Sequence, residues 1–504
     1  MKKILRVCHK WVGLIFSIII LFFSVSGIII NHRAIFAGLD VSRKIMPESY
    51  RLDNYNNGTI RGTLLTKEGK LLAYGIAGVW ETDSCFSFFR EMNKGIPSGA
   101  DYHKILSLVE TADKSFWCIN NFAAYRMSEY GSWKKIFDDK EELEDMTLRG
   151  DTLVLLGRSK IFLSFPPYTH FEEHILRPAR YYSKKTTLFR TIWMVHSGEL
   201  LGTPGKIFVD FIAIVLIILC VTGIAFTYKK SRMKHIKNVD KRKRGTTLMK
   251  ANIKWHNRFG YWLIVFTLLI AVTGICLRDP LSSILKKIEV SPLPCTTLVS
   301  DNPFNDSLRA IRWDAQLGEW LLITSGKMYH LESFDAIPIP FKVKPKISAM
   351  GVNVFEKVGK DWVIGSVSGL YKFDVQKEQV KDYAKRTEGK DDHSNSKKRR
   401  TISVSGFSQY LGPIPVVFTK QKGADKLLPA MPKKMIRQPL SLWNFALELH
   451  TGRYFSLGIK GFSSWYVQIS GLLLIFTLLS GLFIYLRSRR RLPKEHISDK
   501  NGSN

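Results

Sequence analysis

The sequence predicts an α-helical membrane protein with four transmembrane helices in two duplicated halves, carrying two large β-rich segments outside the membrane. Three observations predict this. Four apolar runs are long enough to cross a bilayer. Two of them, HKWVGLIFSIIILFFSVSG from His9 and HNRFGYWLIVFTLLIAVTG from His256, open on a histidine and place glycine four and eighteen residues later. Lys and Arg gather at the ends of the runs that alternation would put on one side.

The four apolar runs each have the length of a membrane span. They are Trp11–Ile30, Ile207–Tyr228, Phe259–Leu277 and Tyr466–Leu486. A spanning helix takes roughly 20 apolar residues at about 1.5 Å rise per residue. In lipid a helix satisfies its own backbone, so each run is predicted to be a transmembrane helix. The first run has the basic start of a signal peptide, but it is too long and lacks a small-x-small cleavage site, which favours an uncleaved helix.

The net charge of +32 predicts topology rather than nucleic-acid binding. The segment 229–258 between the second and third runs carries twelve Lys or Arg and one Asp. Basic residues also begin the chain (Lys2, Lys3) and follow the last run, in the tail that begins RSRRR at Arg487. Under the positive-inside rule these parts are cytoplasmic, so both termini lie inside a bacterial inner membrane and both long segments lie in the periplasm. Contact with anionic lipid is a second use for this charge.

The expected organisation follows from these spans. It comprises helix 1 (1–32), a periplasmic segment (33–190), an outer histidine motif with helix 2 (191–230), a basic cytoplasmic loop (231–255), helix 3 (256–278), a second periplasmic segment (279–441), an outer histidine motif with helix 4 (442–487) and a tail (488–504). The periplasmic segments contain hairpin-like runs such as LLAYGIAGVWE and DWVIGSVSGLYKFDV, in which two apolar stretches flank a small or polar turn. A propeller-like assembly and a looser α+β fold both remain open. The charged stretch 385–400 is expected to be an exposed loop.

Four histidines are the candidate site. His9 and His256 begin helices at the cytoplasmic face, and His196 in WMVHSGELLG and His450 in LELHTGRYF precede helices at the outer face. An ionisable side chain at membrane depth is costly and suggests a function. Two imidazoles fill both axial positions of haem iron, which favours electron transfer over oxygen chemistry. The alternative is that the histidines are ordinary interfacial side chains.

Glycine is expected to help at such a site, because it lets a flat ring approach the backbone. Gly13 and Gly260 each lie one turn after a cytoplasmic-side histidine, on about the same helix face. They are therefore the glycines that the sequence singles out.

The four histidine motifs carry a family resemblance. HKWVGL with SVSGIII, HSGELLGTPGK with VTGIAF, WHNRFG with VTGICL, and HTGRYF with LSGLFIYL resemble the PepSY-associated transmembrane family. That family includes iron-regulated inner-membrane proteins and periplasmic ferric-siderophore reductases. The resemblance implies two b-type haems, one on His9 and His256 and the other on His196 and His450. It implies electrons passing outward from a quinol or a redox partner protein to ferric iron in a siderophore or other chelate.

Other features compete with this interpretation. A haem-free binding, sensing or accessory protein anchored in the membrane is the main alternative. HFEEH, residues 170–174, fits an inverted zincin pattern if it lies on a helix, although chance is the better explanation. His32 is a weaker candidate for the outer site, and a bridge between Cys85 and Cys118 is conceivable. The sequence shows no GxGxxG motif or Walker loop.

Overall fold

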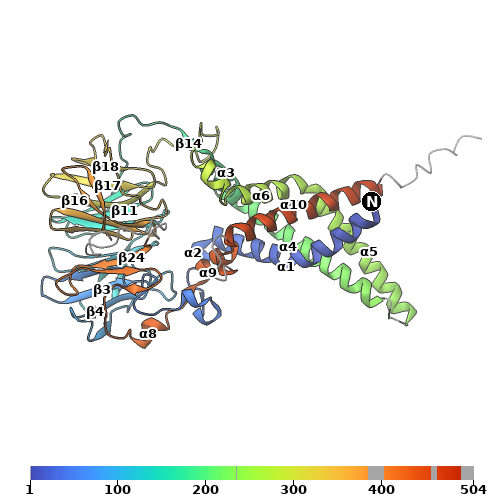
Figure 1. The fold of residues 1–504 in the computed structure, drawn as a ribbon, viewed down its shortest axis with the longest axis horizontal. Helices are drawn as coiled ribbons and strands as arrows, with labels where there is room; N and C mark the ends of the chain where they lie inside the picture. The colour runs from blue at the N-terminus through green and yellow to red at the C-terminus, as the bar shows by residue number, and fades with distance from the viewer. Residues whose placement is uncertain (1, 234, 236, 384–401, 456–461, 490–504) are drawn as a thin grey trace, which may run out of the picture. The chain divides into compact units, whose positions relative to one another are not determined.

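The chain divides into a helical unit and a β unit. The computed structural model describes residues 2–233, 235, 237–383, 402–455 and 462–489. The helical unit comprises 1–33, 184–299 and 443–504, and the β unit comprises 34–183 and 300–442 (Figure 1). The expected loop 385–400 and nearly all of the tail 488–504 lie outside the described residues.

The helical unit contains the membrane-spanning candidates. Its helices are α1 (Lys2–Asn31), α3 (Leu188–Ser197), α4 (Gly202–Met233), α5 (Val239–Trp262), α6 (Ile264–Cys276), α7 (Leu281–Leu285), α9 (Leu442–His450) and α10 (Phe462–Arg489). Strands β14 (Thr186–Thr187) and β15 (Glu289–Val290) pair beside them. Among the described residues, α1, α4 and α10 are each long and apolar enough to cross a membrane. The pair α5 and α6 passes the same test together, so the unit has three such helices, or up to four if the pair is one span.

The basic segment and third span differ from the sequence expectation. Instead of a loop over 231–255, α5 begins at Val239 and continues to Trp262, and α6 follows at a bend of 65°. Lys and Arg are good helix formers, and the Asn238 side chain caps the new helix by accepting a hydrogen bond from the Lys241 backbone N–H. His256 therefore lies within a helix rather than at its start.

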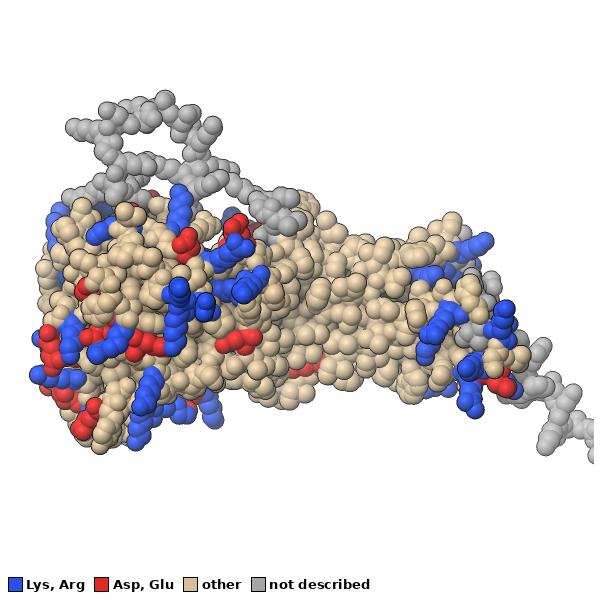
Figure 2. Space-filling model, turned by 90° about the horizontal axis from the view of Figure 1, so that it is seen from below, with Lys and Arg blue, Asp and Glu red and all other residues tan. Residues whose placement is uncertain are grey.

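Charge on the helical unit is confined to its ends on the face shown in Figure 2. The middle of the helices is uncharged there, and Lys and Arg gather at the end where α5 and the N-terminus lie. This is the charge pattern of a bundle that is embedded in lipid.

In its described residues, the β unit consists mainly of six small antiparallel sheets in which sequential strands are neighbours. The first three are β2 (Gly62–Leu65), β3 (Leu71–Gly75), β4 (Gly78–Thr82) and β5 (Phe89–Glu91); β6 (Ser107–Glu110), β7 (Phe116–Ile119), β8 (Ala124–Met127) and β9 (Trp133–Phe137); and β10 (Leu143–Arg149), β11 (Thr152–Gly157), β12 (Ile161–Ser164) and β13 (Glu172–His174).

The other three sheets come from residues 300–442. They are β16 (Leu308–Asp314), β17 (Glu319–Thr324), β18 (Met328–Leu331) and β19 (Ile339–Pro340); β20 (Val354–Val358), β21 (Asp361–Ser366), β22 (Gly369–Asp374) and β23 (Gln379–Asp382); and β24 (Val404–Ser408), β25 (Val416–Thr419) and β26 (Gly423–Ala424). Helices α2 (Arg33–Phe36) and α8 (Lys433–Ile436) and the pair β1 (Asp40–Val41) with β27 (Leu440–Ser441) complete the description.

Each sheet shares a buried apolar cluster with the next one along the chain. In order, the shared clusters contain Tyr74 and Tyr125; Trp117 and Phe162; Leu156 and Trp320; Ile323 and Trp362; and Val363 and Phe407. A sixth cluster, with Phe418 and Trp80, joins the last sheet to the first. The six cores therefore follow one another in a cyclic order, and burial of apolar area between the sheets is the main force that holds the unit together.

A small polar cavity is lined by residues from all six sheets or the segments beside them. Its charged lining residues are Arg61, Asp145, Arg312 and Glu356. Arg312 Nη1 lies 2.5 Å from Asp145 Oδ2. Burial raises the pKa of the Glu356 carboxyl, although Arg312 acts in the opposite direction. The charges at this centre balance, which is what burial in a protein interior requires.

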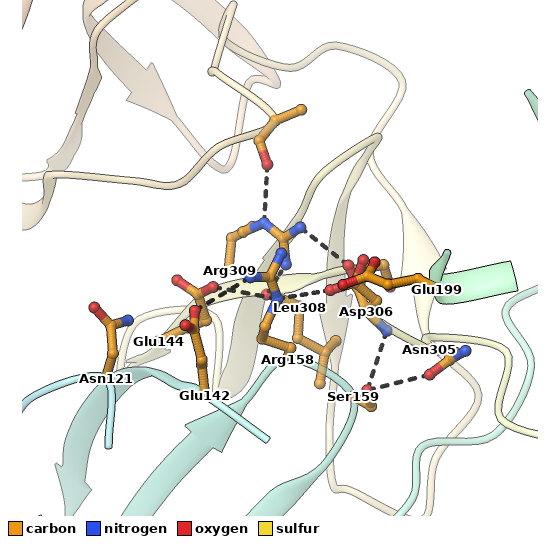
Figure 3. A network of polar contacts seen from close by, with 12 residues as sticks. Asn121, Glu142, Glu144, Arg158, Ser159, Glu199, Asn305, Asp306, Leu308 and Arg309 are labelled. Carbon is orange, nitrogen blue, oxygen red and sulfur yellow. Dashed lines mark hydrogen bonds and ion pairs between the residues drawn. The ribbon is translucent and has the colours of Figure 1, made fainter. Parts of the chain in front are cut away.

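The segments 34–183 and 300–442 also meet at a second polar network, shown in Figure 3. Arg158, between β11 and β12, places its Nε 2.6 Å from Asp306 Oδ1 and its Nη1 3.3 Å from Glu142 Oε2. Ser159 Oγ donates to Asn305 at 3.3 Å. These contacts join parts of the chain that are about 150 residues apart in sequence, so the two segments form one unit rather than two.

The bridge between Cys85 and Cys118 that the sequence left open is not formed. Cys85 and Cys118 are both free. Cys118 lies on β7 with none of its surface exposed, whereas Cys85 lies in an exposed turn after β4, so the two thiols belong to different environments.

Asp145→Asn is expected to lower the free energy of unfolding by about 3–5 kcal/mol, because it leaves the buried Arg61 and Arg312 with Glu356 as the one carboxylate that lines the cavity. Denaturant unfolding of the full chain in detergent, followed by tryptophan fluorescence, measures this. Arg51→Gln is the matched control. It breaks an exposed pair with Glu48 and should cost less than about 1 kcal/mol. Equal effects of the two variants would contradict the prediction.

Candidate functional site

The four candidate histidines all lie in the helical unit. His9 is on α1 and His256 is on α5. His196 is in the last turn of α3, and His450 is the last residue of α9. Both short helices end at a glycine in the left-handed conformation: Gly198 has φ +80° and Gly452 has φ +71°. Glycine adopts this conformation without strain, so the HSG and HTG motifs end the helices just after the histidine.

Each imidazole is anchored by its Nδ1 atom to a hydroxyl on another helix. The four pairs are His9 with Ser480 Oγ (2.9 Å), His256 with Thr222 Oγ1 (2.9 Å), His196 with Thr273 Oγ1 (3.1 Å) and His450 with Ser26 Oγ (3.0 Å). His196 and His450 also contact the carbonyl oxygens of Ile270 and Phe23, three residues before their hydroxyls. One local arrangement therefore occurs four times.

The hydrogen bonds fix the tautomer of the rings. Each hydroxyl donates its single proton to a carbonyl in its own helix, as Ser26 does to Phe22 and Thr273 does to Leu269. The hydroxyl oxygen can therefore only accept from the ring, so Nδ1 carries the imidazole proton. In the neutral ring Nε2 then has a free lone pair. No hydrogen bond from any of these four Nε2 atoms appears among the described residues.

The histidines form two pairs. The ring centroids of His196 and His450 are 6.2 Å apart, with 62° between the ring planes. His9 is close enough to His256 to interact with it electrostatically. His9 and Ser26, which bonds His450, lie on the same helix α1, so the two pairs are separated by roughly 26 Å at about 1.5 Å per residue.

Every anchor joins the two halves of the chain. His9 and His196 belong to the first half and bond Ser480 and Thr273 of the second, while the second-half histidines bond Ser26 and Thr222 of the first. Neither half can position its imidazoles alone.

Glycines do contact the histidines, but they are not the expected ones. Gly13 lies against Thr477 and Gly260 against Leu219. The glycines beside the rings are those that follow the anchoring hydroxyls: Gly27 beside His450, Gly223 beside His256, Gly274 beside His196 and Gly481 beside His9. The bare backbone is what lets each ring reach its partner helix.

The anchoring hydroxyls were missed by sequence reasoning, although they left a signal. Each is the hydroxyl residue of a Ser-Gly or Thr-Gly pair inside an apolar run: Ser26, Thr222, Thr273 and Ser480. In each of four apolar segments a hydroxyl side chain lies directly before a glycine, and this repetition was the signal in the sequence.

Two weaker sequence candidates fall elsewhere. HFEEH lies partly on strand β13, so His170 and His174 do not share a helical face, and Glu173 pairs with Lys160. No group of three or more metal-ligating side chains occurs among the described residues. His32 Nε2 lies 2.5 Å from Asp210 Oδ2, so the ring nitrogen is already engaged by a carboxylate.

A comparison of sequences identifies the region that contains half of these anchors. The model of the PepSY-associated TM region matches residues 131–310. That stretch of the chain is similar to the PepSY-associated TM region. The matched span includes His196, His256, Thr222 and Thr273, and it confirms the resemblance that the histidine motifs suggested.

Comparisons of whole proteins add distant likenesses. No curated protein matches the chain. Among solved structures, the extracellular domain of the putative one-component system BT4673 from B. thetaiotaomicron is similar at 9% identity and TM-score 0.33, covering 74% of this chain and 40% of its own. The N-terminal domain of Nup159, known from S. cerevisiae, is similar at 10% identity and TM-score 0.32, covering 77% and 93%. The chain thus spans about two fifths of the length of the first.

Substituting the four ring-contacting glycines by alanine should distinguish the two glycines that are crowded by a histidine ring from the two that are not. An added Cβ would lie 3.1 Å from His196 Cε1 at Gly274 and 3.0 Å from His9 Cε1 at Gly481, closer than ordinary contact. We expect both variants to lower the free energy of unfolding of the protein by about 1–3 kcal/mol. Thermal unfolding in detergent is the measurement.

The other two glycines are the controls. At Gly27 and Gly223 the added atom would meet the ring at 3.5 and 3.6 Å, which is ordinary contact. Alanine there should be neutral or stabilising, because it is the better helix former. A uniform response of all four variants would show that the rings do not lie where the structure places them.

Proposed function

We propose that this chain is a bis-haem transmembrane electron-transfer protein that reduces ferric iron in a siderophore or other chelate. The single observation that carries the proposal is that all four imidazoles are hydrogen-bonded through Nδ1. Each ring therefore keeps a free lone pair on Nε2, and the four rings form two pairs. An imidazole held in this way through its other nitrogen is the usual form of a protein metal ligand.

The residues present fit two haems. An imidazole–iron–imidazole axis with metal–nitrogen bonds of about 2 Å puts the ring centroids about 6 Å apart. The His196–His450 separation of 6.2 Å agrees with that value. His9 and His256 would hold the second group. The four glycines leave the space beside the rings that a bulkier side chain would fill.

Haem with two histidine ligands supplies one-electron transfer without an open position for oxygen. The chain's own residues would do the rest. Ser26, Thr222, Thr273 and Ser480 orient the rings and raise their basicity as ligands. The helices around them are apolar and keep water from the sites. A separation of roughly 26 Å along α1 would place one site toward each face of a hydrocarbon core about 30 Å thick.

The topology of an inner-membrane protein with cytoplasmic termini is part of the proposal. Because residues 34–183 and 300–442 form one compact unit, the chain between them must cross the bilayer an even number of times. This supports counting α5 and α6 as one bent span beside α4, which gives four spans in two related halves. The basic end of the helices would then face the cytoplasm. A quinol or a redox partner protein would deliver the electrons.

The β unit would receive the ferric chelate. Its cyclic order of shared cores supports a propeller-like arrangement of six blades, with Arg61, Asp145, Arg312 and Glu356 at the centre. Ferric iron prefers hard oxygen ligands more strongly than ferrous iron does, so reduction weakens the chelate and releases the metal. The step requires proximity and a suitable potential, and no acid or base in the β unit is assigned to it.

The purified protein is expected to show a sharp low-spin b-type spectrum on reduction with dithionite, with about two haems per chain. His196→Ala and His256→Ala should each remove one haem, because they belong to different pairs. His32→Ala is the control and should retain both, since its ring is engaged by Asp210. A colourless wild-type protein from haem-replete cells would reject the proposal and favour the haem-free binding or sensing alternative.

The dithionite-reduced protein in detergent should be reoxidised by a ferric hydroxamate or citrate chelate, with a ferrous chelator capturing the released iron. His196→Ala should slow this reoxidation by at least tenfold, because the outer site would be the last carrier before the chelate and would lack a ligand. The rate is followed as loss of the reduced haem spectrum in a stopped-flow mixer. Equal rates in both proteins would show that the outer site is not on the path to iron.

A further inference from the structure

The two outer histidines are held at their backbone by residues in equivalent positions of the two halves. Asn31 Nδ2 donates to the carbonyl oxygen of Ser197, the residue after His196, at 3.1 Å. Arg278 Nη2 donates to the carbonyl oxygen of Thr451, the residue after His450, at 2.5 Å. Asn31 lies 22 residues after His9, and Arg278 lies 22 residues after His256.

These contacts have a clear structural purpose. A helix leaves its last carbonyl groups without partners inside the helix. The Ser197 and Thr451 carbonyls belong to the ends of α3 and α9, where the chain turns at Gly198 and Gly452. A side chain from the end of the neighbouring span satisfies each carbonyl and so fixes the turn that carries the histidine.

The two positions differ in charge. Asn31 is neutral, and it also lies 3.4 Å from the Asp210 carboxylate. Arg278 is cationic, because a guanidinium keeps its proton in proteins. The first half thus offers an amide at this place and the second half offers a full positive charge beside the His450 segment.

Arg278 lies in a cluster of charges with Arg453, Asp279 and Glu448. Glu448 is nearby, but it forms a two-pronged pair with Arg453, with both oxygen–nitrogen distances at 2.8 Å. Asp279 lies on the exposed surface and accepts hydrogen bonds from Ser282 and Ser283, so solvent screens it. Arg278 itself is only partly exposed, and a charge near a low-dielectric interior acts more strongly than one in water.

We infer that Arg278 is the positioning residue for His450 and the fixed charge that makes a metal held by the outer histidine pair easier to reduce than one held by the inner pair. This inference rests on the proposed function. A nearby positive charge destabilises the oxidised, more positive state of the metal, and the net charge around a haem is one of the factors that set its potential. Electrons would then run downhill from His9 and His256 toward His196 and His450.

The test is a potentiometric titration of the haem-loaded protein with three variants. Arg278→Gln keeps a donor for the Thr451 carbonyl and removes the charge. It should retain two haems and weaken the outer site's affinity for its electron about tenfold, a shift of about 59 mV for one electron. Arg278→Lys keeps the charge and should restore most of that shift. Lys286→Gln removes an exposed charge on the same connecting segment and should change neither potential.

A fourth variant should shift the potential of the outer site in the opposite direction, and it leaves Arg278 in place. Glu448→Gln removes a negative charge from the same cluster and should raise the potential of the outer site. The inner site should stay unchanged in every variant. Unaltered outer potentials in Arg278→Gln and Glu448→Gln, with two haems bound, would overturn the inference alone. If Arg278→Gln does not accumulate, Glu448→Gln decides by itself. A wild-type protein without haem would instead remove the proposed function on which the inference rests.

Discussion

The helical unit depends on one recurring interaction, the hydrogen bond between an imidazole Nδ1 and a hydroxyl on a helix of the other half. The hydroxyl can accept because its own proton is committed to a carbonyl one turn earlier, as in Ser480 and Thr477. The direction of this hydrogen bond determines the tautomer of the imidazole and therefore which ring nitrogen is free. The glycine after the hydroxyl residue determines how closely the ring can approach the partner helix. The same bond also ties the halves together, so assembling the bundle and building the site are one event.

Features that follow from repeated patterns in the sequence could be predicted, whereas contacts between helices could not. The apolar helices and the closeness of His196 to His450 could be predicted, because hydropathy and spacing are properties of the chain itself. The roles of Ser26 and Thr273 could not, since a hydroxyl in an apolar run bonds its own helix as readily as a neighbour. Gly13 and Gly260 were singled out by closeness along the chain. The glycines that touch the rings are close only in space, across a helix–helix contact.

The β unit shows the same limit. The hairpins could be predicted from strand–turn–strand patterns, and the strands do pair in sequence order. The sheet against which each sheet packs could not be predicted, because nothing in the sequences of β4 and β25 shows that their apolar faces pack together. The basic stretch before His256 was expected to be a loop because it joins two apolar runs. Charge excludes it from lipid but not from a helix, and α5 continues through it.

The division of the β unit between two outer segments has a consequence for biogenesis. The sheets β2–β13 are synthesised before α3 to α6, and the sheets that cover their two open faces are synthesised only afterwards. The apolar surfaces around Leu156 and Trp80 therefore stay exposed to solvent while the helical segment between them and their partner sheets enters the bilayer. Domains generally fold as units, and exposed apolar faces invite aggregation until the unit is complete. A nascent chain of this protein thus passes through a period in which its half-built β unit exposes apolar surface, and slow folding of α3 to α6 would prolong that period.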